Sequence, residues 1–196
     1  MVRKFTKWEI LSPYLTDYRK SLILADFERE LDKPHQTLKG YIDKLVEDGV
    51  IEVEKKRKHK KYRLNTESPT LFHHLSIAEK LKTDKFLREN TLIKRLYEKI
   101  SPFLLGRKFL VFGSYAVGRE GNDIDLFVVG ERSERLDETL NEFGNTYRDV
   151  HKTQVSGKGE IGRSFKKELH KKHIILNGSD YFVRLFGEIY GEFGMV

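Results

Sequence analysis

Two aspartates separated by one residue, Asp123 and Asp125, have the spacing in this sequence that most clearly indicates chemistry. They stand directly before the apolar run Leu126 to Val129, which is typical of a buried strand. Side chains alternate along a strand, so carboxylates at positions i and i+2 point to the same face. Two negative charges held that close repel each other unless a cation lies between them, and Mg²⁺ prefers such oxygen ligands. The pair therefore predicts a divalent metal site.

A glycine and a serine upstream supply the complementary half of such a site. Gly113 and Ser114 follow the short apolar run Phe109 to Phe112, which is also typical of a strand. Glycine lets the backbone approach a phosphate closely, and a helix that starts here would present free amides and a hydroxyl to an anion. A phosphate-binding turn beside a carboxylate pair predicts a site for phosphoryl or nucleotidyl transfer.

The order of apolar strand, Gly-Ser, spacer and Asp-x-Asp resembles the DNA polymerase β superfamily of nucleotidyltransferases, most closely its minimal, single-domain members. Residues 131–145 have the pattern of the helix between the two carboxylate-bearing strands, and residues 166–178 that of a later helix and strand. The resemblance covers roughly residues 92–190. It implies a mixed-sheet fold and a transfer of NMP from an NTP to a hydroxyl acceptor.

The resemblance also assigns roles to the acidic residues. Asp123 and Asp125 would ligate two Mg²⁺ ions. The family places a third carboxylate on a later strand, and Asp149 is the candidate in this sequence. Asp149 would complete the second metal site and help to deprotonate the attacking hydroxyl. The expected catalytic and metal-binding set is therefore Asp123, Asp125 and Asp149.

Nucleotide-binding roles follow from the same resemblance. Gly113 and Ser114 would hold the triphosphate of an NTP, expected to be ATP, and Arg119 lies near enough along the chain to reach a phosphate. The spacer between Ser114 and Asp123 is shorter than in the minimal members, with the missing residues around Glu120 to Asn122. A shorter spacer affects catalytic turnover more than it affects folding, so nucleotide binding without transfer remains an alternative.

The first third of the chain has the pattern of short helices followed by a basic hairpin. Residues 22–33 and 35–49 carry apolar positions at helical intervals, interrupted at Pro34, and residues 7–18 suit a first helix. Residues 50–65 alternate around the cationic run 55–63, which predicts a hairpin with a charged tip.

This order resembles the winged helix-turn-helix of many prokaryotic transcription regulators, over about Trp8 to Asn65. In such domains the second helix of the turn enters the major groove of double-stranded DNA, and the hairpin touches the backbone. The resemblance makes His35, Gln36, Thr37, Lys39 and Lys44 candidates for the groove-facing surface. The candidates for phosphate contacts are Lys55, Lys56, Arg57, Lys58, Lys60 and Lys61.

The expected fold class is α/β (α+β), in three parts. These are a winged-helix domain at residues 1–66, a helical connector at 67–91 and a nucleotidyltransferase-like domain at 92–196. An apolar stripe in the connector suits packing between domains or across a dimer, and the aromatic residues of the last segment suit core packing. The stripe is Leu71, Leu75, Ala78 and Leu81, and the aromatic residues are Tyr181, Phe182, Phe186, Tyr190 and Phe193. His151, His170 and His173 lie near no motif that requires them.

Composition narrows the classes of protein. The chain has 196 residues, a net charge of +7 and no cysteine. Disulfides and thiolate metal sites are therefore excluded, and a metal must be held by oxygen or imidazole. The sequence has no apolar run of the roughly 20 residues that a membrane span needs, and its first residues lack the apolar core of a secretory signal. These features predict a cytoplasmic protein without a membrane partner.

Three functions from different classes remain open at this stage. The first is a DNA-binding protein with a Mg²⁺-dependent domain that transfers NMP. The second is a winged-helix transcription regulator whose nucleotidyltransferase domain only senses a nucleotide, and the third is a DNA-binding module with a purely structural second domain. Retention of the candidate carboxylates argues against the third, because uncompensated carboxylate clusters are destabilising. A homodimer on a palindromic site and a small helical partner protein are further expected partners.

Overall fold

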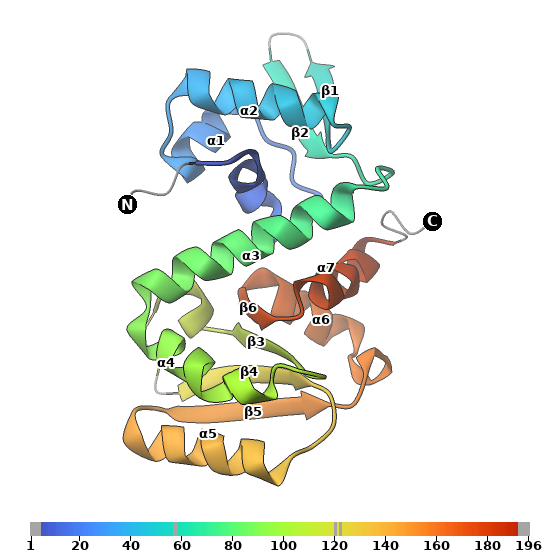
Figure 1. The fold of residues 1–196 in the computed structure, drawn as a ribbon. Helices are drawn as coiled ribbons and strands as arrows, with labels where there is room; N and C mark the ends of the chain where they lie inside the picture. The colour runs from blue at the N-terminus through green and yellow to red at the C-terminus, as the bar shows by residue number, and fades with distance from the viewer. Residues whose placement is uncertain (1–4, 57–58, 120, 122, 192–196) are drawn as a thin grey trace.

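The computed structural model describes residues 5–56, 59–119, 121 and 123–191. These residues form an N-terminal unit, a long central helix and a C-terminal unit of helices around a sheet (Figure 1). The α-helices are α1 (Leu24–Leu31), α2 (His35–Glu47), α3 (Leu71–Glu89), α4 (Thr91–Ile100), α5 (Glu134–Thr146), α6 (Arg163–Lys171) and α7 (Ser179–Gly187). The strands are β1 (Ile51–Lys56), β2 (His59–Leu64), β3 (Lys108–Phe112), β4 (Asp123–Val129), β5 (Asp149–Val155) and β6 (His173–Asn177). The 3-10 segments are η1 (Lys7–Tyr14), η2 (Ser101–Phe103), η3 (Tyr115–Val117), η4 (Lys158–Glu160) and η5 (Glu188–Tyr190).

The N-terminal unit contains the expected order of helices and hairpin. Helix α2 buries Leu38, Ile42 and Leu45, which recur at helical spacing and so lie on one face. It ends before Gly49, whose φ of +68° is the left-handed conformation that glycine adopts readily after a helix. Strands β1 and β2 pair antiparallel, as the alternating pattern predicted, and Leu22 forms an isolated bridge to the second of them.

Helix α3 lies between the two units (Figure 1). Its residues Leu71, Leu75 and Ala78 are buried in one hydrophobic core, which also contains residues of η1 and of the C-terminal sheet and helices. Three of the four residues of the expected apolar stripe therefore pack between the units, whereas Leu81 is half-buried and lines a cavity. Helix α3 therefore packs against both units rather than serving as a flexible linker, and the two units have a continuous core.

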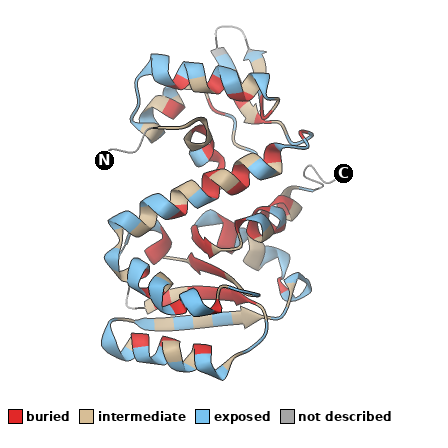
Figure 2. Cartoon of the chain, in the orientation of Figure 1, coloured by how far each residue is buried: buried red, intermediate tan, exposed pale blue. Residues whose placement is uncertain are grey.

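The C-terminal sheet is mixed, with strand order β5-β4-β3-β6. Strand β3 is antiparallel to both of its neighbours, and β4 is parallel to β5 because α5 crosses over between them. Helices α4 and α5 cover one face of the sheet, in a core that includes Ile124 and Leu126. Helices α3, α6 and α7 lie on the other face, which includes Leu110 and Phe127, and Figure 2 shows the central strands as buried.

The aromatic residues near the end of the chain belong mainly to the core. Phe182 and Phe186 on α7 are fully buried, as expected for packing residues. Phe193 lies outside the described residues. Among the described helices, none combines the length and the apolar character that crossing a membrane requires.

Candidate active site

Asp123 and Asp125 lie at the beginning of β4 and point to the same face of the sheet. Ile124 between them is buried in the core on the opposite face, so the alternation expected from the sequence is confirmed. Burial raises the pKa of Asp125 above its usual value, and the charge of Asp123 raises it further. A carboxylate that resists ionisation in this way gains most from a nearby cation.

Gly113 directly follows β3 and lies against Asp125 of the acidic pair. Its φ is +74°, and a Cβ atom added to it would lie 2.5 Å from Oδ2 of Asp125. A side chain at this position would therefore displace the carboxylate. The turn brings bare backbone against Asp125, which is the arrangement needed to place a phosphate beside a metal site.

The turn after Gly113 closes on itself. The carbonyl of Ser114 accepts hydrogen bonds from the amides of Val117 and Arg119, and the Tyr115 hydroxyl donates one to the carbonyl of Gly121 at 3.1 Å. The helix expected to start here is only the three-residue segment η3, so a helix macrodipole contributes nothing to anion binding. Arg119 is exposed at the end of this turn, while Glu120 and Asn122 lie outside the described residues.

Asp149, the third expected carboxylate, is the first residue of β5 and is paired in register with Asp123. Its position on a neighbouring strand agrees with the sequence prediction. Its side chain is exposed, and Oδ1 lies 3.5 Å from where a Cβ atom on Gly144 of α5 would be. Asp149 is not among the residues whose ligand atoms gather at the acidic pair.

His151 is the residue that joins the two aspartates. It is paired in register with Asp125, and its Nδ1 atom is in contact with Oδ2 of Asp123. Ligand atoms of Asp123, Asp125 and His151 all lie within 4.8 Å of one another. The expectation that His151 has no required neighbour is therefore wrong. Its separation of two residues from Asp149 was the available signal, because that spacing puts both on one face of a strand.

The other two histidines also have specific surroundings. His173 is buried, with Nε2 2.7 Å from Oε1 of Glu79 and Nδ1 2.9 Å from the carbonyl of His170. His170 is buried as well, and the hydroxyl of Tyr190 lies 3.1 Å from its Nδ1. The sequence indicated neither contact, since the side-chain partners Glu79 and Tyr190 lie 94 and 20 residues away along the chain.

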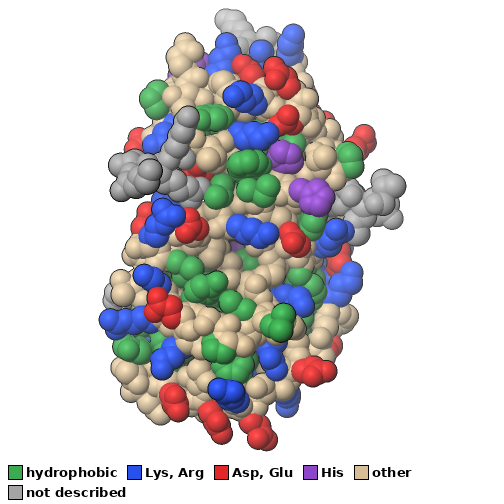
Figure 3. Space-filling model, in the orientation of Figure 1, with side chains coloured by type: hydrophobic (Ala, Val, Ile, Leu, Met, Phe, Trp, Pro, Cys, Tyr) green, Lys and Arg blue, Asp and Glu red, His purple; other side chains and the backbone are tan. Residues whose placement is uncertain are grey.

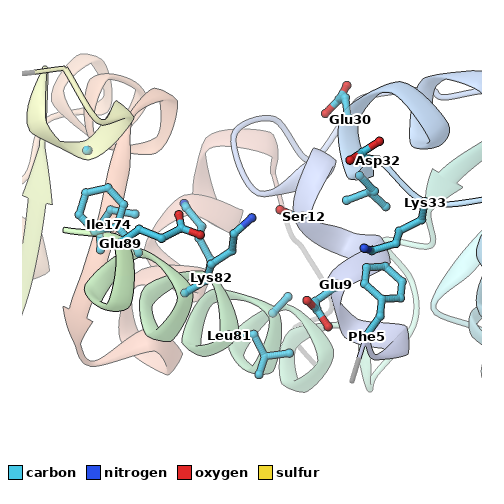
Figure 4. A pocket seen from close by; sticks show the side chains of 15 residues that line it. Phe5, Glu9, Ser12, Glu30, Asp32, Lys33, Leu81, Lys82, Glu89 and Ile174 are labelled. Carbon is cyan, nitrogen blue, oxygen red and sulfur yellow. The ribbon is translucent and has the colours of Figure 1, made fainter. Parts of the chain in front are cut away.

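A cavity of about 600 Å³ lies away from the acidic pair, between the N-terminal unit and α3. Figure 4 shows side chains from the N-terminal helices on one side and from α3 and β6 on the other. Its lining mixes acidic, basic and apolar residues. One end reaches Ala116 of η3, within the turn that follows Gly113, so the cavity borders the supports of the site rather than the site.

The residues expected to contact DNA lie on two surfaces of the N-terminal unit. The five candidates on α2 are all exposed, although His35 pairs with Glu28 at 2.7 Å. On the hairpin, Lys55 and Lys60 are exposed and directly opposite each other, and Lys61 is half-buried. The side chain of Lys56 and all of Arg57 and Lys58 lie outside the described residues. On the face that Figure 3 shows, positive and negative side chains are interspersed.

Residues 90–179 match the family model described as Nucleotidyltransferase domain. This span includes β3, the turn at Gly113, the aspartate-bearing start of β4, and β5. The match supports a nucleotidyltransferase domain in the C-terminal unit, and with it nucleotidyltransferase activity with an NTP as substrate. Neither the curated proteins nor the solved structures gave a match to this chain.

Proposed function

We propose that this protein transfers NMP from an NTP to a hydroxyl acceptor, with divalent metal held by Asp123 and Asp125. The observation that supports it most is the contact between the phosphate turn and the acidic pair. Gly113 leaves no room for a side chain against Asp125. A triphosphate lying on this turn would have its phosphate oxygens beside the carboxylates, and these carboxylates would hold the metal ion that neutralises the phosphate charge.

The residues present fit a divalent metal. The aspartates are close together, carry like charges and supply hard oxygen ligands. A third group on β5 completes the donor set. Asp149 is the candidate from the sequence, and His151 is the candidate that the geometry adds. When bound, the metal neutralises charge on the phosphates and orients them for in-line attack.

The proposed reaction has a simple balance. The acceptor oxygen forms a bond to the α-phosphorus, the bond from that phosphorus to the bridging oxygen breaks, and pyrophosphate leaves. The acceptor proton goes to a basic group at the site, the role proposed for Asp149. Gly113 and Ser114 hold the phosphates, and Arg119 is exposed where it can pair with one of them.

Calorimetric titration of ATP, GTP, CTP and UTP with Mg²⁺ tests the site directly. The double variant Asp123→Ala/Asp125→Ala should lose binding. The variant Glu138→Ala/Glu142→Ala, on an exposed face of α5, removes the same charge and should bind normally. Transfer of label from the NTP with release of pyrophosphate supports the enzyme. Binding without release supports a nucleotide-sensing regulator, and no binding by the wild type contradicts both.

We also propose that the N-terminal unit binds double-stranded DNA as a winged helix. The order of helices, the bridge from Leu22 to the hairpin and the exposed polar start of α2 support this proposal. Lys55 and Lys60 face each other across the hairpin, an arrangement that costs free energy unless an anion lies nearby. Two copies on a palindromic site would follow, and sedimentation of the protein with and without DNA measures that stoichiometry.

A further inference from the structure

We propose that His151, not Asp149, is the third metal ligand, and that the site therefore binds Mn²⁺ in preference to Mg²⁺. This inference rests on the proposed function, because it concerns the metal that the same site would hold. It changes the expected donor set from three carboxylates to two carboxylates and one imidazole.

The position of His151 carries the first step. It pairs with Asp125 across β4 and β5, so the two side chains share one face of the sheet. Its Nδ1 atom meets Asp123, whose side chain is 33% exposed, so one imidazole touches one aspartate and lies next to the other. An ion shared by both aspartates would lie within reach of the same nitrogen.

Asp149 lies two register pairs from His151, at the start of β5, where it is paired with Asp123. Its carboxylate is exposed and lies near Gly144 of α5, away from the group that the two aspartates form with His151. Its ligand atoms are not part of that group, so the geometry favours His151 as the third ligand.

The register of β5 is fixed by contacts with the end of β4 and with helix α5. Gln154 donates a hydrogen bond to the carbonyl of Gly130 at 2.9 Å, and the amide of Gly130 donates one to Val155 at 2.9 Å. Lys152 is paired with Asp137 of α5, on the opposite face from His151. These contacts lie just beyond His151 and fix the register that places it opposite Asp125.

The donor set then determines the metal. Imidazole nitrogen is a softer ligand than carboxylate oxygen and favours transition-metal ions, whereas Mg²⁺ binds almost entirely through oxygen. Replacing a carboxylate by a neutral imidazole also removes one negative charge from the site. The imidazole nitrogen weakens Mg²⁺ binding more than Mn²⁺ binding, whereas the lost charge weakens both.

The test uses the full chain labelled with ¹⁵N-histidine and loaded with Mn²⁺ and a non-hydrolysable ATP analogue. Pulsed electron paramagnetic resonance detects ¹⁵N coupled to the Mn²⁺ ion, and the label confines that signal to histidine. Competition with Mg²⁺ gives the relative affinities. The variants are His151→Ala, the matched control Asp149→Asn, and Asp125→Ala.

We expect ¹⁵N coupling in the wild type and in Asp149→Asn, and none in His151→Ala. Loss of the ligand should weaken Mn²⁺ binding by roughly tenfold or more, and the Mn²⁺ preference over Mg²⁺ should shrink. His151→Asp should shift the preference toward Mg²⁺. Coupling that is absent in the wild type, or that persists in His151→Ala, overturns this inference. In that case, loss of Mn²⁺ binding in Asp125→Ala would leave the proposed function intact without the His151 ligand. A wild type that binds no metal overturns both the His151 ligand and the proposed function.

Discussion

Glu79 on α3 and His173 on β6 form a fully buried ion pair, with 2.7 Å between Oε1 and Nε2. His173 pairs across the sheet with Phe112, and Phe112 pairs with Asp125, so the ion pair lies in the same row of the sheet as the candidate site. Helix α3 also packs against the N-terminal unit. Glu79 therefore connects the helix between the two units to β6, which lies next to β3 and the turn at Gly113.

Breaking this pair should strongly destabilise the protein. Burial alone would raise the pKa of Glu79, but the charges of His173 and Lys82 and their hydrogen bonds hold it at about 2. Glu79→Ala leaves a buried imidazole without its partner, a change that costs about 3–5 kcal/mol. Urea unfolding measures this cost. His173→Leu and the double variant Glu79→Leu/His173→Leu complete a thermodynamic cycle, in which the double variant should cost less than the two single changes together. Strictly additive costs would contradict the pairing.

Stability should also fall on acidification from about pH 6.5, because His170 is held neutral. Burial, followed by the charge of His173, lowers the pKa of His170 to about 3. Its unfolded value is higher, so the unfolded chain takes up the proton first. The His170 contribution is complete above the unfolded pKa and is lost as the pH falls toward the folded pKa, by up to about 1.4 kcal/mol per pH unit.

His170→Phe checks this sign. The variant removes the titrating group while keeping an aromatic ring beside Phe186, whose ring centroid lies 4.6 Å from that of His170. Free energies of unfolding at pH 7, 6 and 5 should depend less steeply on pH than in the wild type. Part of the slope remains, because burial also lowers the pKa of His74. An unchanged slope would show that His170 does not titrate on unfolding.

Local patterns account for the parts of the site that the sequence predicted. The shared face of Asp123 and Asp125 depends only on the alternation along one strand. The turn at Gly113 follows from a residue type that tolerates a positive φ and close approach. The hairpin and α2 follow in the same way from periods of two and of 3.6 residues.

The missed residues depend on contacts that no local pattern contains. His151 faces Asp125 because the crossover through α5 sets the register of β5 on β4. That register cannot be read from the local pattern of a single sequence. Glu79 and His173 are 94 residues apart and meet only after α3 has packed on the sheet. Sequence resemblance predicted Asp149 on a later strand, and it lies on the strand beside Asp123. Which side chain of that strand reaches the aspartate pair depends on the tertiary structure.

Gly113→Ala should abolish metal and nucleotide binding without unfolding the protein. The added methyl group would lie 2.5 Å from Asp125 Oδ2 and push the carboxylate away. Gly118→Ala is the matched control, since Gly118 has a φ of +70° in the same turn but has nothing within 4 Å of an added Cβ. Both variants carry a backbone strain of about 1–2 kcal/mol. Thermal unfolding and calorimetry together should show similar destabilisation but a binding loss only for Gly113→Ala. Equal binding losses would contradict the role of the close approach.

Removing charge from the hairpin should weaken DNA binding for all sequences. Lys55→Ala/Lys60→Ala/Lys61→Ala should lower the slope of log affinity against log salt by roughly 0.9 for each lost phosphate contact. Fluorescence anisotropy over a salt series measures the slope. Lys94→Ala/Lys99→Ala/Lys171→Ala removes the same charge from exposed positions of α4 and α6 and should leave the slope near the wild-type value. Equal slopes in all three proteins would refute contact through the hairpin.

Asp125→Asn should raise the melting temperature of the metal-free protein. Burial and the charge of Asp123, with a further contribution from Glu168, raise the pKa of Asp125, so its ionised form destabilises the fold at neutral pH. That penalty is absent at a pH below the unfolded pKa and is complete above the folded pKa. A relief of about 1 kcal/mol raises the melting temperature by about 2–4 °C in a chain of this size. Asp137→Asn is the control, because it removes an equal charge but breaks the pair with Lys152, and it should not stabilise the protein.

Mn²⁺ with an ATP analogue should stabilise the wild type and not Asp125→Asn, since a ligand that binds only the native state raises the melting temperature. A metal-free Asp125→Asn that melts at or below the wild-type temperature would show that the acidic pair is not under electrostatic strain.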